Sequence, residues 1–332
     1  MAWSQNPAIR HAEPMTPEER DQIESRFAEA RILELRFKPV RGTFDAGHLR
    51  EVNRRIFQDL PKVPGFENVT PGEFRPPVGA GKDWIKQRAL DTVNGSFFVS
   101  YSRMDGAAKI RLDQVLEGAK PDALRGLNTQ DFTQRLGELY ADLDHVHPFS
   151  DGNSRTLRAF TGQLAREAGY AIDWDRFSRT PIGRDLLYIA RDRSVNEIAK
   201  PHIQHPDTMK KVINTLGRTE GNRALPELLR DVVRPSRAIA FEKLPEAEAL
   251  ERFPDLAPAY KTMRAAPAYF ASKMPGDKEA QKAGVQAAVA HIQTRLNAGE
   301  TQDFSRLRVQ KEKEHQAPQE SRDVQPSRPG PE

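Results

Sequence analysis

The chain has 332 residues, enough for one large domain or two of roughly 150 residues each, and it contains no cysteine. A disulfide-stapled miniprotein, a thiolate zinc site and a catalytic thiol are therefore excluded. Lys and Arg number 51 against 47 Asp and Glu, a net charge of +4, so a polybasic coat for nucleic acid is not expected. Hydrophobic residues make up 37% and charged residues 30%, which predicts a folded core with polar flanks.

No run of about 18 apolar residues occurs in the sequence, and the first 22 residues are polar. We therefore expect no membrane segment and no signal peptide, and a protein that is made in the cytoplasm.

Residues 1–30 predict a polar helical lead-in. Thr16 is a suitable N-cap, Pro17 fits the first helical position, and the acidic Glu18 and Glu19 suit the first turn.

A core helix is predicted after Asp45, which is a plausible capping residue. Apolar residues then recur at helical spacing, namely Leu49, Val52, Ile56 and Leu60. Residues 61–84 are rich in Pro and Gly and predict a loop, and residues 96–101, after the Asn94–Gly95 turn, predict a short strand.

Two amphipathic helices are predicted on either side of a short junction. The first begins at Asn128 or Thr129 and ends near His147, and the second follows residues 151–154 and stops at Gly169. Their apolar faces consist of Phe132, Leu136, Leu139, Leu143 and Val146 in the first, and Leu157, Phe160, Leu164 and Ala168 in the second.

The rest of the chain is mostly helical in pattern. Residues 180–220 continue the helical region, and 225–300 form a block interrupted by prolines that predicts a small accessory domain. From about 301 the chain has four prolines and few apolar residues, which predicts a disordered tail.

The junction between the two amphipathic helices carries the chemistry. The free N–H groups of Gly152, Asn153 and Ser154 at a helix start make an anion site of phosphate size. Arg155 and Arg158 follow on one face of the first turn, so their guanidinium groups can point back at that anion.

Two further residues of the junction supply metal and acid–base chemistry. Asp151 offers a hard oxygen ligand for Mg²⁺. His147, at the end of the preceding helix, can take a proton from an attacking hydroxyl. Phe149 is expected to point inward and hold the loop against the core.

The junction reads HPFSDGNSRTLR and resembles the signature H-x-F-x-[D/E]-G-N-x-R-x-x-R of Fic domains at all seven specified positions. A looser resemblance extends from about Leu33 to about Leu216, including Gly42–Asp45 and Pro71–Arg75. It implies an all-α fold: a Fic-like helical core with a short β-hairpin flap, here with a small helical C-terminal extension.

The resulting organisation is a lead-in over 1–30, a Fic-like catalytic domain over 31–216, a helical accessory domain over 217–300 and a disordered tail over 301–332. The resemblance implies a protein adenylyltransferase, which moves AMP from ATP to a Tyr, Ser or Thr hydroxyl of a target protein and releases pyrophosphate.

The resemblance also implies a role for each matching residue. His147 would be the general base and Asp151 the Mg²⁺ ligand. Gly152–Asn153 would hold the α-phosphate, while Arg155 and Arg158 would clamp the β- and γ-phosphates of ATP. The segment 93–101 resembles the flap that aligns the target backbone by strand addition.

Ser154 departs from the family, which most often has glycine there. Its backbone N–H stays available, so it is counted with the nucleotide-binding residues, but its hydroxymethyl group could crowd a phosphate or form a hydrogen bond with it.

Many Fic proteins are inhibited by a helix with the pattern [S/T]-x-x-x-E-[G/N]. The nearest stretch here, Ser25–Ala30, fails at its last position. We expect Glu29 to be an ordinary surface acid, with a degenerate inhibitor as the alternative, and we expect inhibition by a separate small antitoxin protein.

Other motif-like features are weaker. His145 and His147 lack a third metal ligand at suitable spacing, and Gly79–Lys82 lacks the features of a phosphate loop. His202 and His205 are expected to be loop residues.

The sequence therefore predicts a protein adenylyltransferase that acts as a bacterial toxin or secreted effector. The alternatives are a Fic relative that transfers UMP or phosphocholine, or a catalytically silent protein-binding module. Fic relatives modify small GTPases or type II topoisomerases, and nothing in this sequence chooses between these classes of target. No membrane or direct nucleic-acid partner is expected. The Pro-rich, Arg-containing tail is compatible with export by a type IV secretion system.

Overall fold

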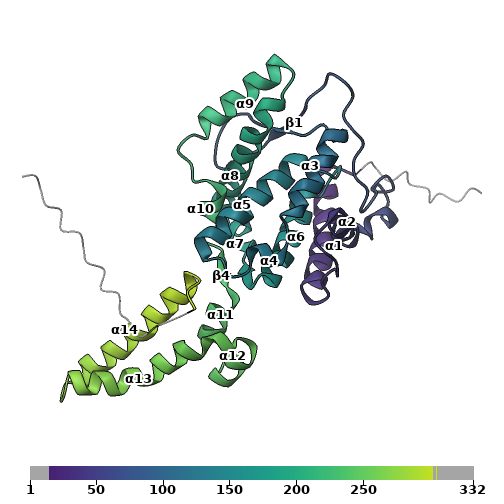
Figure 1. Ribbon diagram of the computed structural model, residues 1–332. Coiled ribbons are helices and arrows are strands. Elements are labelled where there is room, and N and C mark those ends of the chain that lie inside the picture. The colour runs from purple at the N-terminus through teal and green to yellow at the C-terminus, as the bar shows by residue number, and fades with distance from the viewer. Residues whose placement is uncertain (1–14, 302–303, 305–332) are drawn as a thin grey trace, which may run out of the picture.

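The structure is a computed structural model that describes residues 15–301 and residue 304. In this part of the chain the fold is helical, with two small two-stranded antiparallel sheets (Figure 1). The α-helices are α1 (Pro17–Phe37), α2 (Ala46–Phe57), α3 (Gly106–Glu117), α4 (Pro121–Leu124), α5 (Thr129–Val146), α6 (Asn153–Glu167), α7 (Asp175–Ser178), α8 (Pro181–Ala199), α9 (Pro206–Arg218), α10 (Leu225–Leu229), α11 (Ser236–Lys243), α12 (Glu246–Arg252), α13 (Ala257–Lys273) and α14 (Lys278–Asn297). The strands are β1 (Trp84–Arg88), β2 (Phe97–Tyr101), β3 (Tyr170–Ile172) and β4 (Val233–Pro235), and the 3-10 turns are η1 (Leu60–Lys62), η2 (Lys200–His202) and η3 (Pro254–Leu256). The expected all-α class with a short hairpin is confirmed.

Helix starts lie where the capping residues predict them. Thr16 and Glu19 form a reciprocal capping box at the start of α1, and the Asp45 carboxylate accepts a hydrogen bond from the N–H of His48 in the first turn of α2 at 2.8 Å. Asn128 caps α5 in the same way. Because α1 runs to Phe37, the predicted lead-in over 1–30 ends inside a continuous helix.

The flap is a hairpin in which β1 pairs with β2, so that Trp84 lies opposite Tyr101. The sequence predicts β2 but leaves most of β1 without an assigned element, and the expected flap over 93–101 covers only the second strand. The reason is that β1 is short and contains charged residues, Lys86 and Arg88, so that only its pairing with β2 reveals it.

One continuous apolar core extends from Ala28 to Val233. Helix α5 lies in the middle of it and packs against α6, α8 and α10. This core includes Leu225, Leu228 and Leu229 of α10, so it continues past the domain boundary at 216 expected from the sequence.

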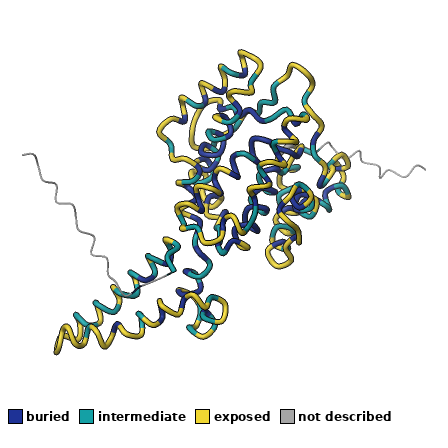
Figure 2. The backbone as a smooth tube through the Cα atoms, viewed as in Figure 1, coloured by how far each residue is buried: buried dark blue, intermediate teal, exposed yellow. Residues whose placement is uncertain are grey.

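Helices α11–α14 form an extension with a core of its own, which runs from Ala238 to Phe304. Figure 1 shows α13 and α14 as an antiparallel hairpin that projects from the main body, and Figure 2 shows that most of its surface is exposed. Apart from Thr301 and Phe304, the expected tail over 301–332 lies outside the described residues. Among the helices that are described, none is long and apolar enough to cross a bilayer.

Candidate active site

The junction between α5 and α6 turns on two residues with left-handed backbone. His147 ends α5 at φ 49° and ψ 61°, and Gly152 begins α6 at φ 73° and ψ 8°. Phe149 between them is buried, as predicted, and it packs beside Phe74 with ring centroids 5.5 Å apart. The two reversals bring the imidazole at the end of one helix close to the N-terminus of the next.

Gly152 is required by space as well as by conformation. A Cβ atom there would lie 2.1 Å from the ring of Phe57, and positive φ is strained for residues with a side chain. No side chain caps α6 at Gly152, so the first N–H groups of this helix remain available to a ligand.

Asn153 braces the loop with its side chain. Its Oδ1 accepts from the backbone N–H of Phe149 at 3.0 Å, and its Nδ2 donates to the carbonyl of Phe149 at 2.7 Å. The amide is therefore occupied inside the protein, and only the backbone N–H of Asn153 can take part in the predicted phosphate site.

His147 is buried under the flap. Its ring lies 3.8 Å from that of Tyr101 and edge-on to Trp84 at 5.3 Å, centroid to centroid. Nε2 faces the ammonium group of Lys86 at 3.5 Å, and Nδ1 faces a carboxylate oxygen of Asp144 at 3.5 Å.

These surroundings keep the imidazole of His147 neutral. Burial lowers its pKa to about 4; Asp144 opposes this shift, and the positive charge of Lys86 adds to it. Burial also lowers the pKa of Lys86, against the attraction of Asp151. A neutral imidazole can accept a proton at pH 7, which is what a general base requires.

Behind His147 lies a buried ion pair between Asp144 and Arg191. Nε and Nη2 of Arg191 donate to the same oxygen of Asp144 at 3.1 and 2.7 Å. Burial alone would raise the pKa of Asp144, but Arg191 and His147 outweigh it and hold that pKa well below its usual range. Burial likewise lowers the pKa of Arg191, and Asp144 outweighs it, so the net pKa is raised. Both groups are charged.

The two arginines of the motif lie in different environments. Arg155 forms an ion pair with Glu24 of α1 and donates to the hydroxyl of Ser25 at 2.8 Å. Arg158 donates from Nε to the carbonyl of Ser154 at 3.3 Å, and among the described residues it forms no ion pair with a carboxylate. Burial lowers the pKa of Arg158.

Two cavities meet these residues. One of about 680 Å³ lies between α1 and α6 and is lined by Arg155 and Arg158, with the exposed Glu29 on its wall. A smaller one of about 210 Å³ is lined by Asp151 and Glu24. The Glu24–Arg155 ion pair therefore joins the walls of the two cavities.

The carboxylate of Asp151 is exposed. In the part of the chain that the structure describes, no three His, Cys, Asp or Glu side chains gather as a metal site. A single carboxylate suits Mg²⁺ when the remaining ligands are phosphate oxygens and water. The donor set around Asp151 therefore fits a metal that arrives with a nucleotide, and it does not fit a metal held by protein alone.

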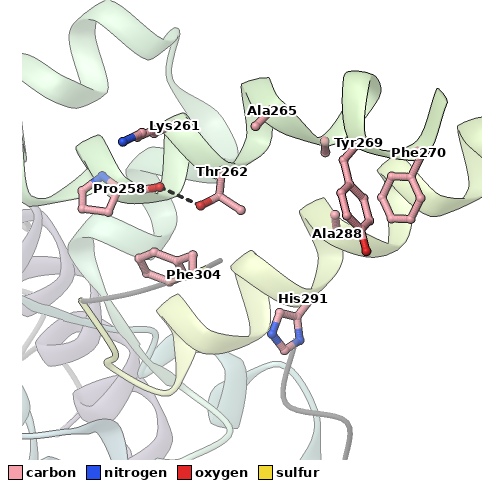
Figure 3. Close-up of a pocket in the computed structure, with 10 residues that line it drawn as sticks. Pro258, Lys261, Thr262, Ala265, Tyr269, Phe270, Ala288, His291 and Phe304 are labelled. Carbon is pink, nitrogen blue, oxygen red and sulfur yellow. Dashed lines mark hydrogen bonds between the residues drawn. The ribbon is translucent and has the colours of Figure 1, made fainter. Parts of the chain in front are cut away.

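His145 and the cavity in the C-terminal extension lie apart from the residues of the α5–α6 junction. His145 stacks against His202 at 6.1 Å, and burial and the charge of Arg111 lower its pKa to about 3. A cavity of about 590 Å³, lined by Tyr269, Phe270 and other residues, lies between α13 and α14 in the extension and includes no residue of the motif (Figure 3).

Residues 43–165, which include the whole junction, match the Fic/DOC family. The chain carries a Fic domain. Over 165 residues it is 35% identical to the protein adenylyltransferase VbhT of Bartonella schoenbuchensis, a match that covers 49% of this chain and 30% of VbhT. Over 131 residues it is 30% identical to the probable protein adenylyltransferase Fic of Escherichia coli, covering 38% of this chain and 52% of the relative.

A solved structure, the ADP-bound N-terminal Fic domain of a VirB-translocated effector from Bartonella quintana, aligns with 68% of this Fic-domain chain and 89% of its own at 20% identity and a TM-score of 0.41. The chain spans about half or less of the two curated relatives.

Sequence reasoning missed several residues that contact the motif. Glu24, Lys86 and Arg191 come from α1, β1 and α8, and no local pattern marks them. The sequence could have predicted Asp144, because it lies three residues before His147 on the same helix face and can therefore contact it.

Proposed function

We propose that this protein transfers AMP from ATP to a hydroxyl group of a target protein and releases pyrophosphate. The observation that carries the proposal is the neutral, buried imidazole of His147 at the uncapped N-terminus of α6. The names of the relatives, protein adenylyltransferases, support the same reaction.

The chemistry follows from charge and position. The target hydroxyl gives its proton to Nε2 of His147 while its oxygen forms a bond to the α-phosphorus of ATP. The bond from that phosphorus to the oxygen bridging to the β-phosphate breaks, and the electron pair leaves with pyrophosphate. The N–H groups of Gly152–Ser154 hold the α-phosphate, and Arg155 and Arg158 hold the leaving group.

Mg²⁺, held by Asp151 together with phosphate oxygens and water, would neutralise charge on the nucleotide phosphates. This chain contributes one carboxylate to such a site. Lys86 must turn away from Nε2 of His147 before the hydroxyl can reach it, which rotation of its side chain allows.

The flap presents one usable edge. The outer edge of β2 is already bonded, because Asn196 of α8 pairs with the backbone of Phe98 and Ser100, and Thr215 of α9 accepts from Phe98. The target backbone would therefore pair with β1 rather than with the segment 93–101 expected from the sequence.

The biological setting is also a proposal. The motif and the composition of the tail are consistent with a toxin or effector that modifies a small GTPase or a type II topoisomerase. Such a protein would be held inactive by a small antitoxin and exported from the cytoplasm by a type IV secretion system.

The test is transfer of label from α-labelled ATP, α-labelled UTP and choline-labelled CDP-choline to proteins of a bacterial or host lysate. We expect label from ATP, reduced about 10²- to 10⁴-fold by His147→Ala, the range that loss of a general base produces. His202→Ala, which changes a histidine of η2 outside the motif, is the matched control. Transfer from UTP or CDP-choline would favour the other phosphate-linked groups, and no His147-dependent label would favour a silent binding module.

A further inference from the structure

Ser154 is turned away from the phosphate site. Its hydroxyl oxygen accepts a hydrogen bond from Nη1 of Arg191 at 3.1 Å, and Arg191 is 2% exposed. The hydroxymethyl group therefore does not crowd the N-terminus of α6 but joins it to the centre of the core.

The same guanidinium group reaches the catalytic histidine through Asp144. Two of its nitrogens donate to one oxygen of that carboxylate. The other oxygen of Asp144 has no hydrogen-bond partner and no access to solvent, and neither has Nδ1 of His147, which faces it at 3.5 Å. A shift of a few tenths of an ångström would close this gap into a hydrogen bond.

We propose that Arg191 is a positioning residue for the transfer: it bridges Asp144 behind the general base and Ser154 behind the phosphate-binding turn, so that both halves of the site keep one geometry. The proposal rests on the proposed function. Asp144 accepts from Nδ1 of His147 and leaves Nε2 free as the base, while the bond to Ser154 holds the first turn of α6 at a set distance from that atom.

Stability alone is a poor reason for this arrangement. Buried ion pairs contribute little net stability, because removing two charges from water offsets most of their attraction. The ion pair can instead fix the positions of two elements of the site through directed hydrogen bonds, which an apolar pair of the same volume could not form.

The experiment is a double-mutant cycle with Arg191→Lys and Ser154→Ala, scored by kcat and by the KM for ATP. Lysine keeps the charge that Asp144 needs but cannot bond both partners. We expect Arg191→Lys to lower kcat about 30-fold, within the loss of up to 10²-fold that a misplacement of about 1 Å causes. Ser154→Ala should cost about threefold alone and nothing further on top of Arg191→Lys, because the bond is already lost.

Arg193→Lys is the matched control, since Arg193 lies on the same helix and bonds the carbonyl of Asn222 outside the network. It should leave both constants unchanged. Multiplying effects of Arg191→Lys and Ser154→Ala, or unchanged kcat in a folded Arg191→Lys protein, would overturn the bridge.

A second readout does not need activity and keeps the two proposals apart. Nitrogen NMR of the His147 ring should show a single neutral tautomer with the proton on Nδ1. Asp144→Leu combined with Arg191→Met removes both the acceptor and the buried charges, and it should mix the tautomers. If the double variant still shows a single tautomer, the bridge is overturned, whether or not the wild-type protein transfers a nucleotide. If the wild-type protein transfers no nucleotide, only the proposed function is overturned.

Discussion

The main core, which extends from Ala28 to Val233, and the C-terminal extension bury different kinds of side chain. The core buries charged groups such as Asp144, Arg191 and Asp192 among its apolar residues. In the described part of the extension, every buried residue is apolar or aromatic, and five of these are alanines: Ala238, Ala240, Ala249, Ala259 and Ala266. Buried charge costs free energy, so its concentration beside His147 indicates a region organised for chemistry, whereas the core of the extension is formed by apolar packing.

The largest expected effect breaks the extension while leaving the chemistry intact. Leu256→Ala removes a fully buried side chain of the extension core and should destabilise it by about 3 kcal/mol. Hydrogen exchange should show faster opening of α12–α14, with an unchanged transfer rate at 20 °C. The control is Leu157→Ala in α6, which removes an equally buried side chain and should lower the fraction of active protein. A lower transfer rate with Leu256→Ala while the main core stays folded would show that the two regions depend on each other.

Two glycines with positive φ sharpen the same comparison. Gly152→Ala must strain the backbone and meet the ring of Phe57, and we expect kcat/KM to fall about 30-fold, or about 2 kcal/mol. Gly276→Ala has a similar φ of 85° but nothing within 4 Å of its new Cβ, so it should destabilise the extension by about 1 kcal/mol and leave transfer unchanged. Equal effects of the two variants on transfer would contradict the close packing at Gly152.

A smaller effect concerns Arg155, which forms an ion pair with Glu24 of α1. Glu24→Gln should free Arg155 for the leaving phosphates and lower the KM for ATP about fivefold, because a partly exposed ion pair contributes about 1 kcal/mol. The control is Glu29→Gln, an exposed acid on the wall of the larger cavity, which Arg155 also lines, and it should change the KM little. If Glu29→Gln activates more than Glu24→Gln, the degenerate-inhibitor interpretation of Glu29 is preferred.

The smallest effect is in the pH profile. Because the pKa of His147 is lowered from 6.5 to about 4, kcat/KM should fall by less than twofold between pH 7.5 and 5.5 and should decline only as the pH approaches 4. The sign for stability is the same: an imidazole kept neutral by folding stabilises the protein above pH 6.5, and this stability is lost as the pH falls toward 4. An acidic limb near pH 6.5 would place His147 in water rather than under the flap.

Local rules predicted much of this molecule. Thr16, Asp45 and Asn128 cap helices because the caps depend on residues three positions away, and the apolar spacing of α5 and α6 follows from the helical repeat. The sequence did not predict β1, because its charged residues carry no strand pattern. The core extends beyond the predicted boundary at 216, because α10, which follows that boundary in the chain, packs on α5.

The amino-acid sequence by itself determined the helical class, the α5–α6 junction and the candidate residues from His147 to Arg158, since all of these depend on contacts within a few residues. Only the tertiary structure decided what those residues touch. Glu24 reaches Arg155 across 131 positions of sequence, Lys86 reaches His147 across 61, and Arg191 reaches Ser154 across 37. Such contacts form when the core closes, and they depend on how α1, β1 and α8 pack rather than on any spacing that the sequence displays.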